Sequence, residues 1–93
     1  MILDFKCAET EGIWHGRVSR RLPGEIQNIA RRKLRMLNNA AALADLRIPP
    51  ANRLEALKGN RRSQHSIRIN DQWRICFVWN ANGVTAVEIV DYH

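Results

Sequence analysis

The amino-acid sequence predicts an α+β fold, with helices in the first half of the chain and an antiparallel sheet in the second. Apolar residues between positions 26 and 44 recur at steps of three and four, as they do along one face of a helix. Residues 66–79 alternate instead between apolar and polar, as strands do, and turn residues at 70–72 and 80–83 separate the strands. With 93 residues, 45% of them hydrophobic, the chain can form one small core, so we expect a single domain over residues 1–93.

The first half is predicted to hold one short strand and two or three helices. Apolar residues at 2–5 predict a strand that pairs with one from the C-terminal half, and residues 7–14 permit a short helix closed by a glycine. Pro23 suits the first helical position, so we expect a long amphipathic helix from there. Residues 38–39 interrupt its pattern, which leaves a second helical piece through Leu46.

The second half is predicted to form a loop and then three strands. Two consecutive prolines at 49 and 50 end the helical region, and a loop is expected from Arg47 to about Asn60. The predicted strands are residues 63–69, 73–79 and 84–90. The apolar residues of the middle strand fall on one face, which we expect to pack on the long helix. Arg74 is then presented on the uncovered face of the sheet.

Charge and cysteine content limit the partners and the chemistry. Fifteen Lys and Arg against nine Asp and Glu give a formal net charge of +6, which favours RNA, DNA or an acidic protein as partner. Cys7 and Cys76 match neither a metal-ligand spacing nor a disulfide framework. No apolar run has the length of a signal peptide or a membrane span. We expect a cytoplasmic protein with no membrane partner and with no metal or other cofactor.

Three groups of polar residues are candidates for function. Lys58 and Arg61 flank a glycine at a loop-to-strand junction, where the backbone can approach a phosphate. Arg74 suits a guanidinium clamp on a phosphate, with an ion pair to Asp91 or Glu88 as the alternative. The cations at 31–33 and 35 can track phosphates or simply form the solvated face of the helix, and both interpretations stay open.

The chain ends on Asp91, Tyr92 and His93, of which the phenol and the imidazole can move protons. A final histidine is also often only a solvated end of the chain. RNA cleavage without a metal needs an activated 2′-hydroxyl, stabilisation of charge on the phosphate and a proton for the departing 5′-oxygen. Lys, Arg, Tyr and His side chains can supply these together.

Four segments of the sequence, taken together, are specific enough to indicate a family. They are PPANRLEALKGNR at 49–61, SIRIN at 66–70, WRICF at 73–77 and VEIVDYH at 87–93. In order and spacing they resemble the HigB branch of the RelE/ParE toxin superfamily, the plasmid-maintenance killer proteins, over nearly the whole chain. The resemblance implies a RelE-like α+β fold, in which an antiparallel sheet with an N-terminal strand added packs against two to three N-terminal helices.

The resemblance also implies a function. The protein would be the toxin of a type II toxin–antitoxin system, an endoribonuclease that cleaves messenger RNA in the decoding site of the 70S ribosome, without a metal, by attack of the 2′-hydroxyl. The implied partners are a HigA-like helix-turn-helix antitoxin, the ribosome and messenger RNA. Operator DNA would be contacted only through the antitoxin.

The site residues follow from the same resemblance. Lys58, Arg74, Tyr92 and His93 match the family's positions around the scissile phosphate, and Asp91 is the implied orienting partner. The implied RNA- and phosphate-binding residues are Arg53, Arg61, Arg62 and Arg68. Some HigB toxins have a histidine three residues before the motif lysine, and this chain has Glu55 there. This departure leaves open which group is the general base and which the general acid.

Two other functions remain open at this point. A gyrase inhibitor of the ParE branch would use the same scaffold without RNA chemistry and would not need residues 91–93. A basic domain that binds RNA without cutting it would be expected to carry aromatic stacking residues on its basic face, where only Tyr92 qualifies.

Overall fold

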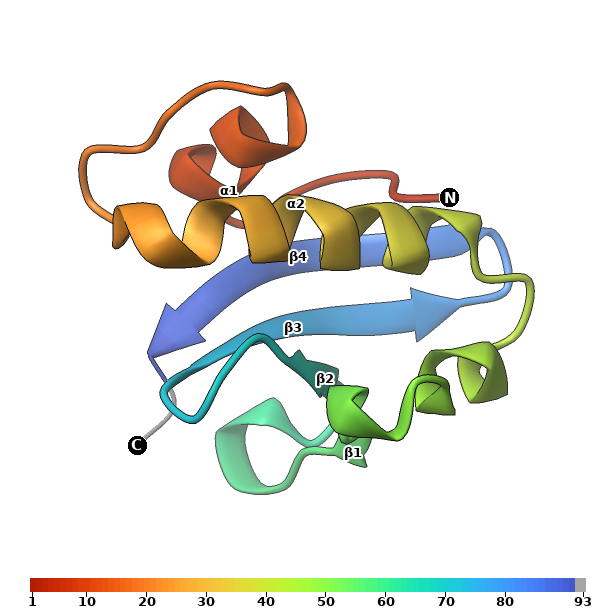
Figure 1. Cartoon of the computed structure of the whole chain (residues 1–93). Coiled ribbons are helices and arrows are strands. Elements are labelled where there is room, and N and C mark those ends of the chain that lie inside the picture. Colours follow the sequence, from red (N-terminus) through yellow and green to blue (C-terminus); the bar gives the residue numbers. More distant parts are fainter. Residues whose placement is uncertain (92–93) are drawn as a thin grey trace.

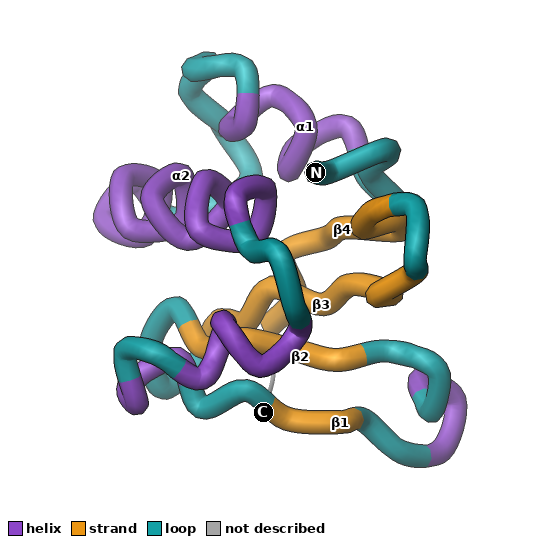
Figure 2. Tube along the Cα trace, turned by 90° about the vertical axis from the view of Figure 1, so that its right-hand side faces the viewer, coloured by secondary structure: helices purple, strands orange, loops and turns teal. Residues whose placement is uncertain are grey.

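Four antiparallel strands form a sheet in the order β1-β2-β3-β4, and the long helix α2 lies across one of its faces (Figures 1 and 2). The structure is a computed structural model that describes residues 1–91. The helices and strands are α1 (Ala8–Trp14), α2 (Gly24–Asn39), β1 (Glu55–Ala56), β2 (His65–Arg68), β3 (Trp73–Asn80) and β4 (Gly83–Asp91). Short 3₁₀ helices occupy the connections, namely η1 (Leu43–Arg47), η2 (Pro50–Asn52) and η3 (Gly59–Arg61). The predicted α+β class is confirmed.

The helix α2 forms because its apolar residues share one face, and that face is buried against the sheet. The fully or almost fully buried residues of this face are Ile26, Ala30, Leu34 and Leu37. They belong to one core cluster with Ile67, Ile75 and Phe77 from the strands. Trp73 and Trp79 pack against the same cluster from the two ends of β3, as the alternation of that strand predicts. The helix-covered face of the sheet is therefore the predicted one.

The predicted interruption of the helical region is also confirmed. The helix α2 ends at Asn39, and Ala40 has an extended backbone. The chain then resumes as η1, in which Leu46 is buried in the core. None of the helices in residues 1–91 is long and apolar enough to cross a membrane.

The predicted loop between Arg47 and Asn60 is wrong in one respect, because it contains the edge strand β1. In this strand Glu55 pairs with Ser66 and Ala56 with His65 of β2. A strand of two residues is too short to show an alternation, so the sequence pattern could not reveal it.

The N-terminal strand expected at residues 2–5 is not confirmed as a regular strand. Residues 2 and 5 make only isolated parallel bridges to Val84 and Val87 of β4. A bulge in β4 explains the interruption, because Ala86 and Val87 together face the single residue Phe77 of β3. Ala86 has a φ of 53°, and its N–H donates to the Asp4 carboxylate at 2.6 Å. The segment therefore follows β4 without a continuous ladder.

The second face of the sheet is left uncovered by α1 and α2. Figure 2 shows α2 on one side of the strands, with η1 and η2 below it, and the loop that carries η3 on the other side. Arg74, the arginine that strand alternation places on the uncovered face, belongs to this second face.

Candidate functional site

A row of polar side chains crosses the uncovered face from one edge of the sheet to the other. Glu55, Ser66, Cys76 and Glu88 are successive register partners in β1, β2, β3 and β4. Directly opposed residues in antiparallel strands point to the same face, so these four side chains share the uncovered face. Arg74 lies two residues before Cys76 on this face, opposite Arg68 on β2 and Val90 on β4.

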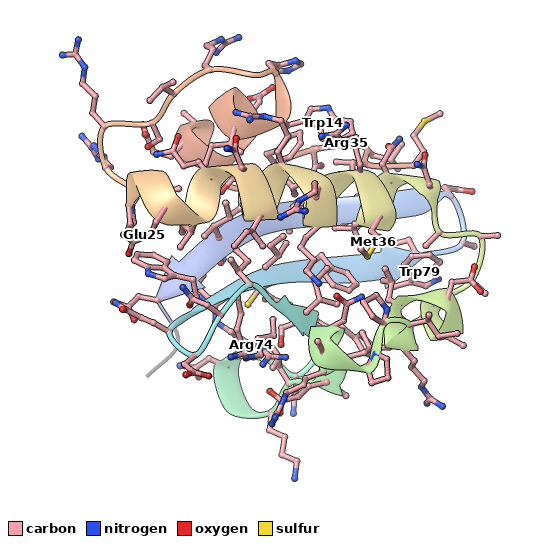
Figure 3. The ribbon with its side chains drawn as sticks, in the orientation of Figure 1. Trp14, Glu25, Arg35, Met36, Arg74 and Trp79 are labelled. Carbon is pink, nitrogen blue, oxygen red and sulfur yellow. The ribbon has the colours of Figure 1, made fainter. Side chains whose placement is uncertain are left out.

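Arg74 is held in place by hydrogen bonds to the neighbouring segments. Its Nε donates to Ser66 Oγ at 2.7 Å, and its Nη2 donates to the carbonyl oxygens of Arg53 at 2.6 Å and Ser66 at 3.4 Å. Ser66 is fully buried, and Arg53 has the left-handed backbone with φ 45° that directs its carbonyl here. Figure 3 shows Arg74 beside β2 and the segment that leads into β1. The guanidinium group thus has a fixed orientation before any ligand arrives.

The ion pair with Glu88, considered for Arg74, is made by Arg61 instead. Arg61 Nη1 lies 2.7 Å from Glu88 Oε1 and also donates to Gln64 at 3.0 Å. Lys6 Nζ approaches the same Glu88 oxygen at 3.8 Å. The η3 loop therefore folds over the uncovered face, and a phosphate at Arg61 would have to compete with a carboxylate that is only 15% exposed.

Lys58 and Glu55 come together beside β1, where they line a cavity of about 250 Å³. Lys58 is exposed and precedes Gly59, whose φ of 64° permits the tight turn into η3. Glu55 is the register partner of Ser66, which in turn binds Arg74. The predicted lysine therefore lies at the edge strand β1, and the predicted arginine is bonded to Ser66 of the adjoining strand β2.

The remaining predicted cations differ in their surroundings. Arg53 and Arg62 are exposed, although the backbone of Arg53 is used by Arg74. Arg68 forms an ion pair with the exposed Asp71 and lines a separate cavity with residues of α2. Asp91 pairs in register with Trp73, and its carboxylate accepts a hydrogen bond from Gln72 Nε2 at 3.1 Å.

The two predicted proton-transfer residues, Tyr92 and His93, lie outside the described residues. The last strand nevertheless passes directly beside Arg74, because Val90 is its register partner. The other histidines occupy different surroundings. His65 stacks on Phe77 of the core at 6.2 Å, and its buried Nδ1 has no hydrogen-bond partner among residues 1–91. His15 lies 3.8 Å from Glu11 on α1.

Ser66 and the Arg53 carbonyl are the contributors to the site that sequence reasoning missed. Ser66 carries a usable signal, because strand alternation places it on the same face as Arg68 and next to the strand of Arg74. The Arg53 carbonyl carries none, since its direction depends on a local left-handed backbone. Among residues 1–91, no group of three or more His, Cys, Asp or Glu side chains is arranged to hold a metal ion.

Comparison with known proteins shows the class to which the chain belongs, the RelE-like toxins of type II toxin–antitoxin systems. Residues 12–93 match the family model described as the RelE-like toxin of type II toxin–antitoxin systems, HigB. Toxin HigB-1 of Vibrio cholerae serotype O1 (strain ATCC 39315 / El Tor Inaba N16961) is 43% identical over 94 residues, covering 100% of this chain and 98% of that protein. An uncharacterized protein of Haemophilus influenzae (strain ATCC 51907 / DSM 11121 / KW20 / Rd) is 34% identical over 70 residues, covering 75% of this chain and 69% of its own. The chain belongs to the HigB-like toxin family, and as a type II toxin it pairs with an antitoxin.

Proposed function

We propose that this toxin is an endoribonuclease that cleaves messenger RNA on the ribosome. The observation that carries the proposal is the anchored guanidinium of Arg74 on the uncovered face, held by Ser66 and by the carbonyl of Arg53. A positive group that is already oriented can stabilise charge as it develops on a phosphate, without the cost of reorganising the site. A net charge of +6 further favours association with ribosomal and messenger RNA.

The proposed reaction uses the substrate's own 2′-hydroxyl as nucleophile. The 2′-oxygen forms a bond to the adjacent phosphorus, and the bond from phosphorus to the 5′-oxygen breaks. Lys58 and Arg74 stabilise the charge on the phosphorane. Of His93 and Tyr92, one takes the proton of the 2′-hydroxyl and the other supplies a proton to the 5′-oxygen. The products are a 2′,3′-cyclic phosphate and a 5′-hydroxyl, and no step needs a metal ion.

The placement of the described residues supports this division of roles. Lys58 lines a cavity with Glu55, which is the register partner of Ser66, the residue that binds Arg74. The strand β4 passes beside Arg74 at Val90. Asp91 is assigned to orient the proton-transfer groups. Arg53, Arg62 and Arg68 are assigned to the RNA backbone, and Arg61 to the same task only when phosphate displaces Glu88.

The proposed partners are those of a ribosome-dependent toxin. They are a HigA-like antitoxin with a helix-turn-helix, the decoding site of the ribosome and its messenger RNA. Operator DNA is contacted through the antitoxin.

The proposal is tested by primer extension on transcripts after brief induction of the toxin. Arg74→Ala is expected to lower cleavage by about 10²–10³-fold, because it removes a fixed charge-stabilising group. Lys58→Ala and His93→Ala are expected to lower it as well. Arg20→Ala, which removes an exposed cation from the connection between α1 and α2, is the charge-matched control and should cleave like the wild type.

Two outcomes would contradict the proposal. Codon-phased cuts that survive all three site changes would show that the assigned residues do not perform the reaction. Growth arrest with DNA damage and uncut transcripts would instead favour a gyrase inhibitor.

A further inference from the structure

A second cavity, of about 280 Å³, lies between α2, η2 and the end of β2. Its apolar lining comes from three segments that are far apart in the sequence. The apolar residues are Ile29 and Met36 of α2, Ala51 of η2 and Ile69 just after β2. Figure 3 shows Met36 on the side of α2 that faces the segment carrying η1 and η2, whereas Arg35 lies on the opposite side of the helix. The cavity therefore has room and apolar surface for an aliphatic side chain from a partner.

The same cavity is lined by three cations, Arg32, Lys33 and Arg68, and by no acidic residue among those described. Burial lowers the pKa of Lys33, and the positive charges of Arg32 and Arg68 lower it further. Arg68 pairs with Asp71, whose side chain is fully exposed. The three cations thus have one acidic partner among the described residues, the solvent-exposed Asp71. A carboxylate that enters the cavity would therefore be attracted by their positive charge.

A buried asparagine holds the lysine of this cavity in position. Asn52 is fully buried, and its Nδ2 donates to the carbonyl oxygens of Leu46 at 3.1 Å and Ile48 at 3.3 Å. These two bonds fix the amide, so its Oδ1 faces Lys33 and accepts a hydrogen bond from the ammonium group. The cation is therefore oriented before binding, which lowers the entropic cost of forming a complex.

The lining suits a peptide better than a nucleic acid. Single-stranded RNA is usually bound by stacking its bases on aromatic side chains, and none of the described residues that line the cavity is aromatic. Isoleucine and methionine instead fit aliphatic side chains, and methionine adapts its shape to them. A cavity with an apolar lining and cations around it is complementary to a peptide segment that has an acidic residue next to an aliphatic one.

We propose that this cavity is a docking site for the antitoxin, which inserts an aliphatic side chain between Met36 and Ile69 and places a carboxylate between Arg32 and Lys33. The occupant is an acidic-aliphatic segment of the partner that every type II toxin requires. The proposal rests on membership of the toxin family and is independent of RNA cleavage. It also gives two cations of the α2 run a role that differs from phosphate tracking.

The test uses the antitoxin encoded in the toxin's own operon, purified and titrated calorimetrically into the full-length toxin. Arg32→Gln and Lys33→Gln are each expected to raise the Kd by about tenfold or more. The Lys33→Gln side chain keeps a donor for Asn52, which limits damage to the fold. Arg35→Gln removes a neighbouring cation from the opposite side of α2 and should leave the Kd within about twofold. Arg68 is left unchanged, because it is the strand partner of Arg74.

Growth assays separate docking from toxicity. The Arg32→Gln and Lys33→Gln toxins should still arrest growth on their own, but co-expressed antitoxin should rescue the cells less well than it rescues cells with the wild-type toxin. An unchanged Kd for both variants would overturn the proposal. So would reduced transcript cleavage with unchanged antitoxin affinity, which would mark the cavity as an RNA surface. A toxin that arrests growth without cutting transcripts would overturn the proposed function and leave this docking test intact.

Discussion

Arg31 donates from its Nε to the carbonyl oxygen of Ile13 at 3.0 Å and from its Nη2 to that of Arg17 at 3.5 Å. It therefore joins α2 to the end of α1, although it belongs to a run of cations for which the sequence left open a phosphate-tracking surface and a solvated helix face. Lys33, two residues later, turns instead to Asn52 in the connection to β1. Neighbouring residues of one charge run thus have separate structural roles, because successive side chains on a helix point about 100° apart.

Asn52 is the residue at which the loss of one side chain should cost most outside the apolar core. Asn52→Ala leaves the carbonyl oxygens of Leu46 and Ile48 without their donor and removes the acceptor of Lys33. We expect the free energy of unfolding to fall by about 1–3 kcal/mol. Urea denaturation measures the change, and Asn60→Ala, at an exposed position in η3, is the matched control with little expected effect. Equal stabilities of the two variants would contradict this role.

Cys76 should make the stability of the protein depend on alkaline pH. Burial raises the pKa of its thiol above the ordinary 9.0, although Arg61 opposes the shift. The folded protein keeps this proton at a pH where the unfolded chain releases it, so the free energy of unfolding falls as the pH rises above 9.0. Cys76→Ala should show a smaller fall between about pH 8 and pH 10 in urea denaturation. The same slope in both proteins would refute the assignment.

Among the elements, the turn between β3 and β4 is the one most constrained by the N-terminal segment. A Cβ atom on Gly83 would lie 2.7 Å from the Met1 carbonyl oxygen and 2.8 Å from Leu3 Cγ, and its φ of 148° disfavours other residues. Gly83→Ala is therefore expected to destabilise the fold by about 1–3 kcal/mol. Thermal unfolding measures this change. In the same experiment the control Gly24→Ala, at the start of α2 with no atom within 4 Å of the added Cβ, should be neutral or slightly stabilising.

How far the sequence predicts an element depends on how many residues share its periodicity. The helix α2 and the strand β3 extend over 16 and 8 residues, and their buried faces agree with the predicted ones. The strand β1 has two residues and no periodicity. The N-terminal segment is bonded at Asp4 to Ala86, in a bulge of β4 that lies 82 residues away in the chain. Both features depend on tertiary contacts, so they cannot be predicted from the local sequence pattern.

The candidate site shows the same division. Strand alternation alone predicts that Arg74 lies on the uncovered face. The strand register agrees, because it places Arg74 opposite Arg68 of β2. The Arg61–Glu88 pair could not be foreseen, because it depends on the η3 loop folding back across the sheet to β4. Tyr92 and His93 stay a prediction from the resemblance to the family.

At the scale of the whole molecule, the two edges of the sheet are closed in different ways. One edge ends in β1, which has only two residues, and the other edge is the nine-residue strand β4. The N-terminal segment covers β4 through bonds between Leu3 and Val84 in one place and Lys6 and Val87 in another, with N–O distances of 2.7 and 2.9 Å. Unpaired donors and acceptors on a long strand edge invite pairing with another chain.

The few residues before α1 therefore cover an edge at which another chain could otherwise pair. A toxin that lacks residues 1–5 should expose the backbone of β4 and self-associate through it, which light scattering would detect as particles larger than those of the full chain at the same concentration. A truncated toxin that stays monodisperse would show that the bulge at Ala86 protects the edge without help. We therefore expect an N-terminal affinity tag to be tolerated better when a linker leaves this segment free to lie along β4.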